Sequence, residues 1–92
     1  MKSSYIYIIT NKYRTTLYVG VTSDLNKRVV EHQNEIGSEF TKKYNLKDLI
    51  YYEEFNDINQ AIAREKQIKN WKKDWKLYLI KEMNPSLITL LL

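Results

Sequence analysis

Residues 5–24 read Tyr-Ile-Tyr-Ile-Ile-Thr-Asn-Lys-Tyr-Arg-Thr-Thr-Leu-Tyr-Val-Gly-Val-Thr-Ser-Asp, and this stretch decides the fold. Aromatic and β-branched residues dominate two runs within it, which predicts strands over residues 5–10 and 17–21. The polar connection between the runs, residues 11–15, is short enough to predict an antiparallel hairpin. The closing Thr-Ser-Asp is typical of a helix start, with Thr22 or Ser23 as the cap and Asp24 in the first turn.

The rest of the chain adds a third strand and three helices. The apolar run at 49–55 predicts the strand, and the helices are expected over 24–34, 57–70 and 73–83. The order β-β-α-β-α-α indicates an α+β fold, a small three-stranded antiparallel sheet flanked by helices.

Local signals place the ends of these elements. Asp57 is the expected cap of the second helix, with Gln60 completing a near capping box. Pro85 ends the third helix, because the residue before a proline is pushed out of the helical region. The polar connection at 38–48 is expected to be anchored by Phe40 and Tyr44.

Length and composition describe one small domain. The 92 residues are 43% hydrophobic and 28% charged, which is typical of a globular protein. We expect a core over about 3–85, followed by an apolar tail at 86–92 that packs on the domain or on a second copy, in a monomer or weak homodimer. The chain has no cysteine, no apolar signal segment and no run long enough for a membrane span, which predicts a cytoplasmic protein.

The charge pattern is compatible with nucleic acid without establishing it. The net charge is +4, and seven of the fifteen basic residues lie between Arg64 and Lys81, interleaved with Trp71 and Trp75. Such a pattern could contact phosphates and bases. The alternative is a solvated helix face whose tryptophans anchor the core, which the pattern alone favours.

Glu65 is the least expected residue of the second helix. At 100° per residue it falls at the centre of a face formed by Ile58, Ala61, Ile62, Ile68 and Lys69. A buried ionised carboxylate costs several kcal/mol unless it is paired, so it requires a partner or a metal. A structural salt bridge, or a side chain that reaches solvent at the edge of the sheet, explains the position equally well.

The first helix places two more functional residue types together. Leu25 and Val29 mark its buried stripe, and His32 lies beside that stripe with Arg28 on its flank. Residues four apart are neighbours on a helix, so Arg28 and His32 can act at one site. A satisfied structural histidine is the alternative.

The hairpin contributes tyrosines and a glycine. Strand alternation places Tyr5 and Tyr7 on one face, and Tyr18 and Gly20 likewise share a face. Packing alone explains a tyrosine in a strand. Gly20 weakens a strand, so it indicates close approach of a backbone or a ligand.

Together these positions resemble the GIY-YIG nuclease domain over about residues 3 to 85, and in particular its small stand-alone bacterial members. The carrying motifs are Tyr5-Ile6-Tyr7 and Tyr18-Val19-Gly20, then an Arg and a His four residues apart, and a Glu on a downstream helix. The stretch 63–69, Ala-Arg-Glu-Lys-Gln-Ile-Lys, is similar as well. Tyr5 departs from the first glycine of the signature.

The resemblance implies a metal-dependent endonuclease that hydrolyses phosphodiester bonds, with possible roles in repair or recombination. It implies a catalytic set whose members should converge on one concave surface: Tyr7, Tyr18, Arg28, His32 and Glu65. Glu65 would hold Mg²⁺ or Mn²⁺, a tyrosine would activate water, with Tyr7 preferred, and Arg28 would clamp phosphate. Asn84 is a further candidate for the site.

The implied partner is nucleic acid, with DNA favoured over RNA and low sequence specificity. Four lysines are expected to contact phosphates: Lys66, Lys69, Lys72 and Lys73. The alternative reading is a non-catalytic nucleic-acid-binding module of the same fold.

Overall fold

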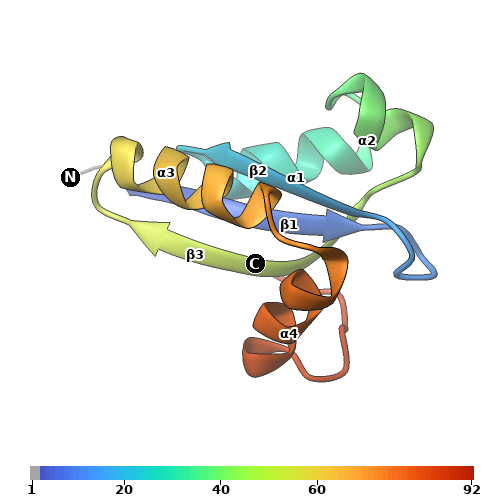
Figure 1. Cartoon of the computed structure of the whole chain (residues 1–92). Coiled ribbons are helices and arrows are strands. Elements are labelled where there is room, and N and C mark those ends of the chain that lie inside the picture. The colour runs from blue at the N-terminus through green and yellow to red at the C-terminus, as the bar shows by residue number, and fades with distance from the viewer. Residues whose placement is uncertain (1–2) are drawn as a thin grey trace.

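A three-stranded antiparallel sheet forms the centre of the molecule. The computed structural model describes residues 3–92, in which the strands are β1 (Ser4–Thr10), β2 (Leu17–Thr22) and β3 (Asp48–Phe55). Their order is β2-β1-β3, so β1 is central and the other two strands are the edges (Figure 1). The predicted α+β class, the sheet and the element order are confirmed.

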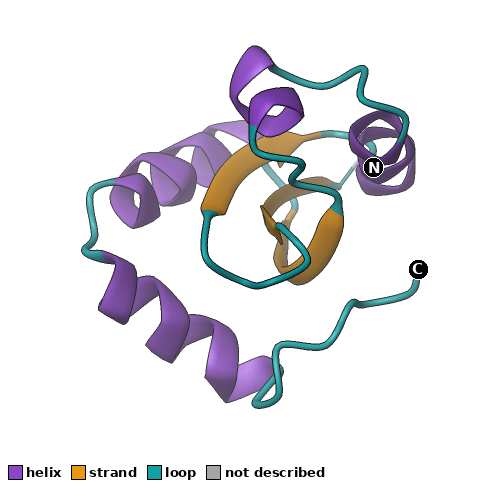
Figure 2. Cartoon of the chain, turned by 90° about the vertical axis from the view of Figure 1, so that its right-hand side faces the viewer, coloured by secondary structure: helices purple, strands orange, loops and turns teal. Residues whose placement is uncertain are grey.

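Helices cover both faces of the sheet. The helices are α1 (Leu25–Gln33), α2 (Glu39–Lys43), α3 (Ile58–Lys69) and α4 (Lys73–Met83). In Figure 1 α3 crosses the front of the sheet and α1 lies behind it, and Figure 2 shows α3 and α4 together on one side. The edge strand β2 therefore runs between α1 and α3.

Alternation along β1 builds two apolar clusters. Ile6 and Ile8 are fully buried on the α3 and α4 side, with Ala61, Ile68 and Ile80. Tyr7 and Ile9 point to the other face, where Leu25 and Val29 of α1 and Leu46 and Leu49 cover them. The strand reads as nearly continuous apolar residues because both of its faces are covered.

The start of α1 differs from the sequence prediction by one or two residues. Asp24, expected in the first turn, is the cap, and its carboxylate accepts from the backbone N–H of Lys27 at 3.1 Å. Thr22, one of the two expected caps, instead ends β2 and accepts from the backbone N–H of Asp24. Asp57 caps α3 as predicted, although it accepts from Asn59 and the described residues make no reciprocal bond from Gln60.

The short helix α2 was not expected. Ser38 caps it by accepting from the backbone N–H of Thr41 at 3.2 Å, within the segment expected to be a plain connection. Phe40 and Tyr44 were the predicted anchors, but both are more than 40% exposed. Thr41 and Leu46 are buried there instead, because the turn of helix points the two aromatic side chains outward. Their rings are tilted against each other, with centroids 4.8 Å apart.

The exposed side of α4 is aromatic, contrary to the expectation that tryptophans anchor the core. Trp75 is 62% and Tyr78 73% exposed, whereas Ile80 is buried and Leu77 and Leu79 pack beside it. Trp71 alone of the two tryptophans packs against the core.

The apolar tail packs on its own domain at two positions. Leu87 joins the α3 side of the core and Leu90 joins the α1 side, so the chain passes around the β3 edge. The backbone N–H of Leu90 donates to the carbonyl of Leu49 at 2.7 Å, which satisfies a group of that edge. Ile88, Leu91 and Leu92 remain largely exposed. Among residues 3–92, no helix combines the length and apolar character that crossing a bilayer requires.

Candidate active site

Tyr7 is the buried centre of the candidate site. It lies on the central strand with 1% of its surface exposed, and its phenolic oxygen is 3.0 Å from Nε2 of His32 on α1. A hydrophobic strand residue and a polar helix residue are thereby joined across the α1 side of the sheet. Tyr7 is therefore hydrogen-bonded as well as packed in the core.

Gly20 makes room for the Tyr7 ring. The two residues are directly paired between β1 and β2. A Cβ atom at position 20 would lie 2.4 Å from both Cζ and the hydroxyl of Tyr7. The close approach that the sequence indicated at Gly20 is therefore present, but the approaching group is the side chain of Tyr7 and not the expected backbone or ligand.

His32 is enclosed from the other side by the turn that follows α1. Its side chain is buried, and a Cβ at Gly37 would lie 2.3 Å from its Nδ1. Within residues 3–92, that Nδ1 atom has no hydrogen-bond partner. A buried N–H without an acceptor costs more than an unused nitrogen lone pair, so this geometry favours the proton on Nε2, where it donates to Tyr7.

Tyr18 covers the Tyr7–His32 pair near the edge of the sheet. Its ring centroid is 6.4 Å from that of Tyr7 and 6.0 Å from that of His32. Phe40 of α2 lies 6.1 Å from Tyr18 on the outer side. The unexpected helix α2 thus contributes the outer wall of this aromatic cluster, and no sequence motif pointed to it.

Arg28 lies on α1, one turn before His32, and is partly exposed. Its Nε is 3.3 Å from a carboxylate oxygen of Glu31. It also lines a hollow of about 660 Å³ between the starts of α1 and α3, and a second hollow of about 350 Å³ along the first turns of α1. The guanidinium is therefore partly open to a ligand, and its carboxylate partner among the described residues is the partly exposed Glu31.

Burial and the nearby charged groups shift the pKa values of Tyr7 and His32. Burial raises the pKa of Tyr7 above its ordinary value and the nearby Tyr18 adds to this, while Arg28 opposes it. Burial lowers the pKa of His32, and the positive charge of Arg28 lowers it further against the opposing Glu31. At neutral pH the pair is therefore an uncharged phenol and an uncharged imidazole.

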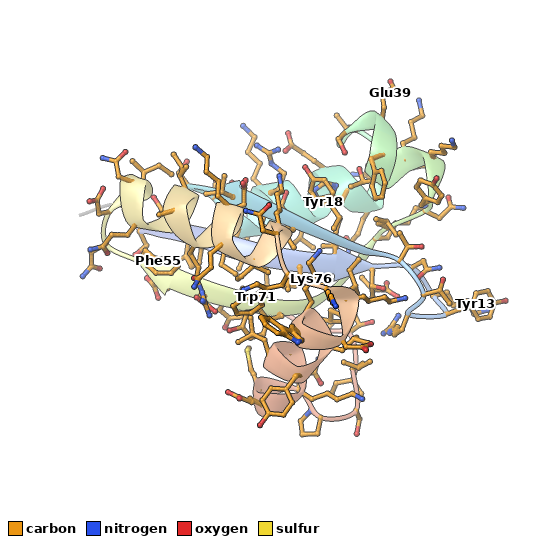
Figure 3. All side chains as sticks on the ribbon, in the orientation of Figure 1. Tyr13, Tyr18, Glu39, Phe55, Trp71 and Lys76 are labelled. Carbon is orange, nitrogen blue, oxygen red and sulfur yellow. The ribbon has the colours of Figure 1, made fainter. Side chains whose placement is uncertain are left out.

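Glu65 reaches the same edge of the sheet from the opposite side. Its side chain is 15% exposed, and one carboxylate oxygen is 3.5 Å from Nζ of Lys69. That same ammonium lies 5.8 Å from the ring centroid of Tyr18. Because β2 is an edge strand, a group on α3 and a ring on β2 can meet there although α3 and α1 cover different faces. Figure 3 shows Tyr18 at this border.

The five expected site residues therefore fall into two groups joined at the β2 edge. Tyr7, Tyr18 and His32 are in mutual contact, and Arg28 influences the charge state of two of them. Glu65 connects to them through Lys69 and has no direct contact with Tyr7 among the described hydrogen bonds and ion pairs. That all five share one phosphate and one ion stays a prediction.

The other sequence candidates lie apart from this cluster. Lys66 and Lys72 are exposed, and Lys73 donates to the carbonyl of Thr15 at the hairpin. Asn84 is 4% exposed and its amide donates to the carbonyls of Ile50 and Ile88 at 3.0 and 2.8 Å. Asn84 therefore fastens the tail to β3, which is sufficient to account for its position.

Metal-binding capacity is limited to a minimal site. Over residues 3–92, no three histidine or carboxylate side chains gather closely enough to hold an ion. Glu65, the predicted ligand, already accepts a cationic group, the Lys69 ammonium, at low exposure. The residues present therefore fit an ion that keeps most of its water and binds through one carboxylate, as Mg²⁺ does.

Known proteins resemble this chain over most of its length. The model of the GIY-YIG catalytic domain matches residues 3–79. The UPF0213 protein SSP2268 of Staphylococcus saprophyticus is 38% identical over 82 residues, covering 89% of this chain and 99% of its own. A UPF0213 protein of Staphylococcus aureus is 35% identical with the same coverage. The solution structure of the UPF0213 protein BH0048 from Bacillus halodurans shares the fold, with a TM-score of 0.59 at 23% identity over 91% of this chain and 88% of that one.

Proposed function

The chain belongs to the GIY-YIG family, and from that premise we propose that it is a metal-dependent endonuclease acting on DNA. The observation that carries the proposal is the Tyr7–His32 hydrogen bond, with Arg28 adjacent and Glu65 approaching across the β2 edge. Hydrolysis of a phosphodiester requires a base, a positive group for the developing charge and a ligand for a metal. The named residues supply one of each.

Glu65 is the proposed ligand of Mg²⁺ or Mn²⁺. A bound ion would supply positive charge to a phosphate oxygen and to the leaving oxygen. In this structure the cation beside the Glu65 carboxylate is the Lys69 ammonium, whose Nζ is 3.5 Å from Oε1 of Glu65. A carboxylate arranged to bind a cation at low exposure supports the assignment.

Tyr7 is the proposed general base, with His32 as its hydrogen-bond donor. Because Nδ1 of His32 is buried and the described part of the chain offers it no hydrogen-bond partner, Nε2 is favoured as the protonated atom and can stabilise a Tyr7 phenolate. Burial works against that phenolate, whereas Arg28 lowers the pKa of Tyr7. Tyr18 would then position the substrate next to Tyr7 through its ring and hydroxyl.

Arg28 is the proposed clamp for the scissile phosphate. Arg28 lines a hollow between the starts of α1 and α3 and a second one along α1, and among the described residues its guanidinium pairs with the partly exposed carboxylate of Glu31. A phosphate with developing negative charge can displace that partner and bind two guanidinium N–H groups. Arg28 therefore contributes most at the transition state.

We propose DNA over RNA as the substrate. Low sequence specificity is proposed because the exposed lysines would contact phosphates, which carry no sequence information. These lysines are Lys66, Lys69 and Lys72, with Lys73 beside them. A chain without cysteine is compatible with a reducing compartment, so we place this activity in the cytoplasm, where repair or recombination intermediates are accessible substrates.

One observation favours a second candidate, a non-catalytic nucleic-acid-binding module. Tyr7 is 1% exposed and burial raises its pKa, so in this conformation the proposed base is closed to bulk solvent and protonated. A nuclease must open this cluster when substrate binds. A binding module need not.

One assay distinguishes the nuclease from the non-catalytic binding module. Purified protein is incubated with single-stranded, duplex and branched DNA, and with RNA, in Mg²⁺, Mn²⁺ or EDTA. We expect nicking of DNA in either metal and none in EDTA. Binding of these nucleic acids without cleavage of any of them would replace the nuclease by the binding module.

A further inference from the structure

The outer side of α4 carries a groove that the catalytic site does not use. It measures about 540 Å³ and is lined by Trp71, Asp74, Trp75, Tyr78, Leu79 and Glu82. In Figure 3 Trp71 lies where α3 passes into α4, with Lys76 nearby. These positions recur every three or four residues, so they form one stripe along the helix.

Two of the three aromatic residues that line this groove, Trp75 and Tyr78, do not pack on the core, whereas Trp71 does. Trp75 is 62% and Tyr78 73% exposed, and Ile80 on the opposite side supplies the buried contact. Leaving two large aromatic rings in water forgoes the burial that such side chains normally obtain. Their exposure therefore indicates a ligand with flat apolar surfaces.

Trp71 lines the groove and is held in place by contacts with neighbouring side chains. The guanidinium of Arg64 lies 5.3 Å from its ring, and Arg64 is itself fixed by Glu53 at 3.0 Å. Trp75 meets the same ring edge-on at 6.2 Å. The platform is thus organised before any ligand arrives, which lowers the cost of binding.

The charges around the groove match a nucleic acid strand. Lys72 and Lys76 each follow a groove tryptophan by one residue, so helical spacing places both on one flank of the stripe, where their ammonium groups can neutralise phosphates. Asp74 and Glu82 line the groove itself, where carboxylates can accept hydrogen bonds from the amino groups of bases. Positive charge beside the stripe and acceptors within it fit a strand whose bases face the protein.

We propose that this groove binds single-stranded nucleic acid by stacking bases on Trp75 and Tyr78. The inference rests on the proposed function, to which it adds the substrate class: DNA with an unpaired segment, such as a flap or gap. Paired bases are stacked in the duplex and cannot enter the groove, so the site selects unpaired strands.

The test measures binding in EDTA, so that cleavage plays no part. Fluorescence anisotropy of a labelled single-stranded oligonucleotide of mixed sequence is compared between wild type, Trp75→Ala and Tyr78→Ala. We expect each variant to bind about 5- to 100-fold more weakly, as for one lost stacking platform. Trp75→Phe, which keeps a ring, should restore most of the affinity.

Tyr13→Ala is the matched control. Tyr13 is 77% exposed and has Lys12 over its ring at 5.7 Å, but it lies at the tip of the β1–β2 hairpin, away from α4 (Figure 3). It should bind as wild type does. The Trp75→Ala variant should also bind a duplex of the same length with unchanged affinity.

Three results would overturn the proposal. The first is Trp75→Ala binding the single strand within twofold of wild type. The second is an equal loss of duplex binding. The third is a wild-type dimer that Trp75→Ala converts to a monomer in sedimentation with unchanged oligonucleotide affinity, which would make the groove an interface between copies. Strand binding through Trp75 without any cleavage would instead remove the proposed nuclease and leave the groove intact.

Discussion

The hydroxyl of Tyr7 and Nε2 of His32 lie 3.0 Å apart, joining the central strand to the end of α1 inside the core. Two glycines lie against this pair, Gly20 against the tyrosine ring and Gly37 against the imidazole. They are the only glycines of the chain. Both glycines are therefore located next to the hydrogen bond between Tyr7 and His32.

Gly20→Ala should destabilise the protein by about 1–3 kcal/mol, as overpacking in a core does. The backbone at Gly20 has no positive φ, so the cost arises from the new methyl group against the Tyr7 ring. Urea unfolding measures it. In a Tyr7→Leu background, where the ring is absent, the same substitution should cost clearly less. Equal costs in the two backgrounds would show that the contact does not matter.

Stability should fall as the pH falls from about 7 toward 5, and His32 should cause part of that fall. The pKa of His32 is lowered in the folded protein, so the unfolded chain binds the proton more readily near its ordinary value of about 6.5. The free energy of unfolding therefore decreases with acidification in that window. His32→Gln, which cannot titrate, should show a shallower pH dependence, and identical slopes would contradict the assignment.

Leu90→Ala should cost about 1–3 kcal/mol, whereas Leu91→Ala should stay within about 0.5 kcal/mol of wild type. Leu90 packs on the Tyr7 side of the core and its N–H donates to Leu49, while Leu91 is 94% exposed. The two substitutions remove the same atoms one residue apart. Similar thermal stabilities for both variants would mean that the tail does not pack in solution.

The sheet could be predicted from the sequence because its signal is local. Residues 5–10 and 17–21 carry strand-forming residues on both sides of a short polar loop, and both strands form within one residue of these bounds. The contact between Tyr7 and His32 depends on packing between residues 25 apart, which strand alternation and helical phase narrow but do not determine.

Other parts of the site had no readable signal. Helix α2 rests on a single cap, Ser38, in a polar segment, and its role in covering Tyr18 through Phe40 depends on tertiary packing. Trp75 was expected to anchor the core and is exposed. Helical periodicity alone does not determine which side of the helix packs on the sheet. The position of Lys69 between Glu65 and Tyr18 likewise follows only from how α3 lies along the β2 edge.

The most direct test of the central claim is the DNA nicking rate of Glu65→Gln in saturating Mg²⁺, beside wild type and Glu35→Gln. Glu35 is the matched control, a half-exposed glutamate paired with Lys47 at 3.3 Å and outside the described site contacts. We predict that wild type and Glu35→Gln nick at equal rates, and that Glu65→Gln remains folded and loses metal-dependent cleavage. Nicking by Glu65→Gln at the wild-type rate would contradict the account.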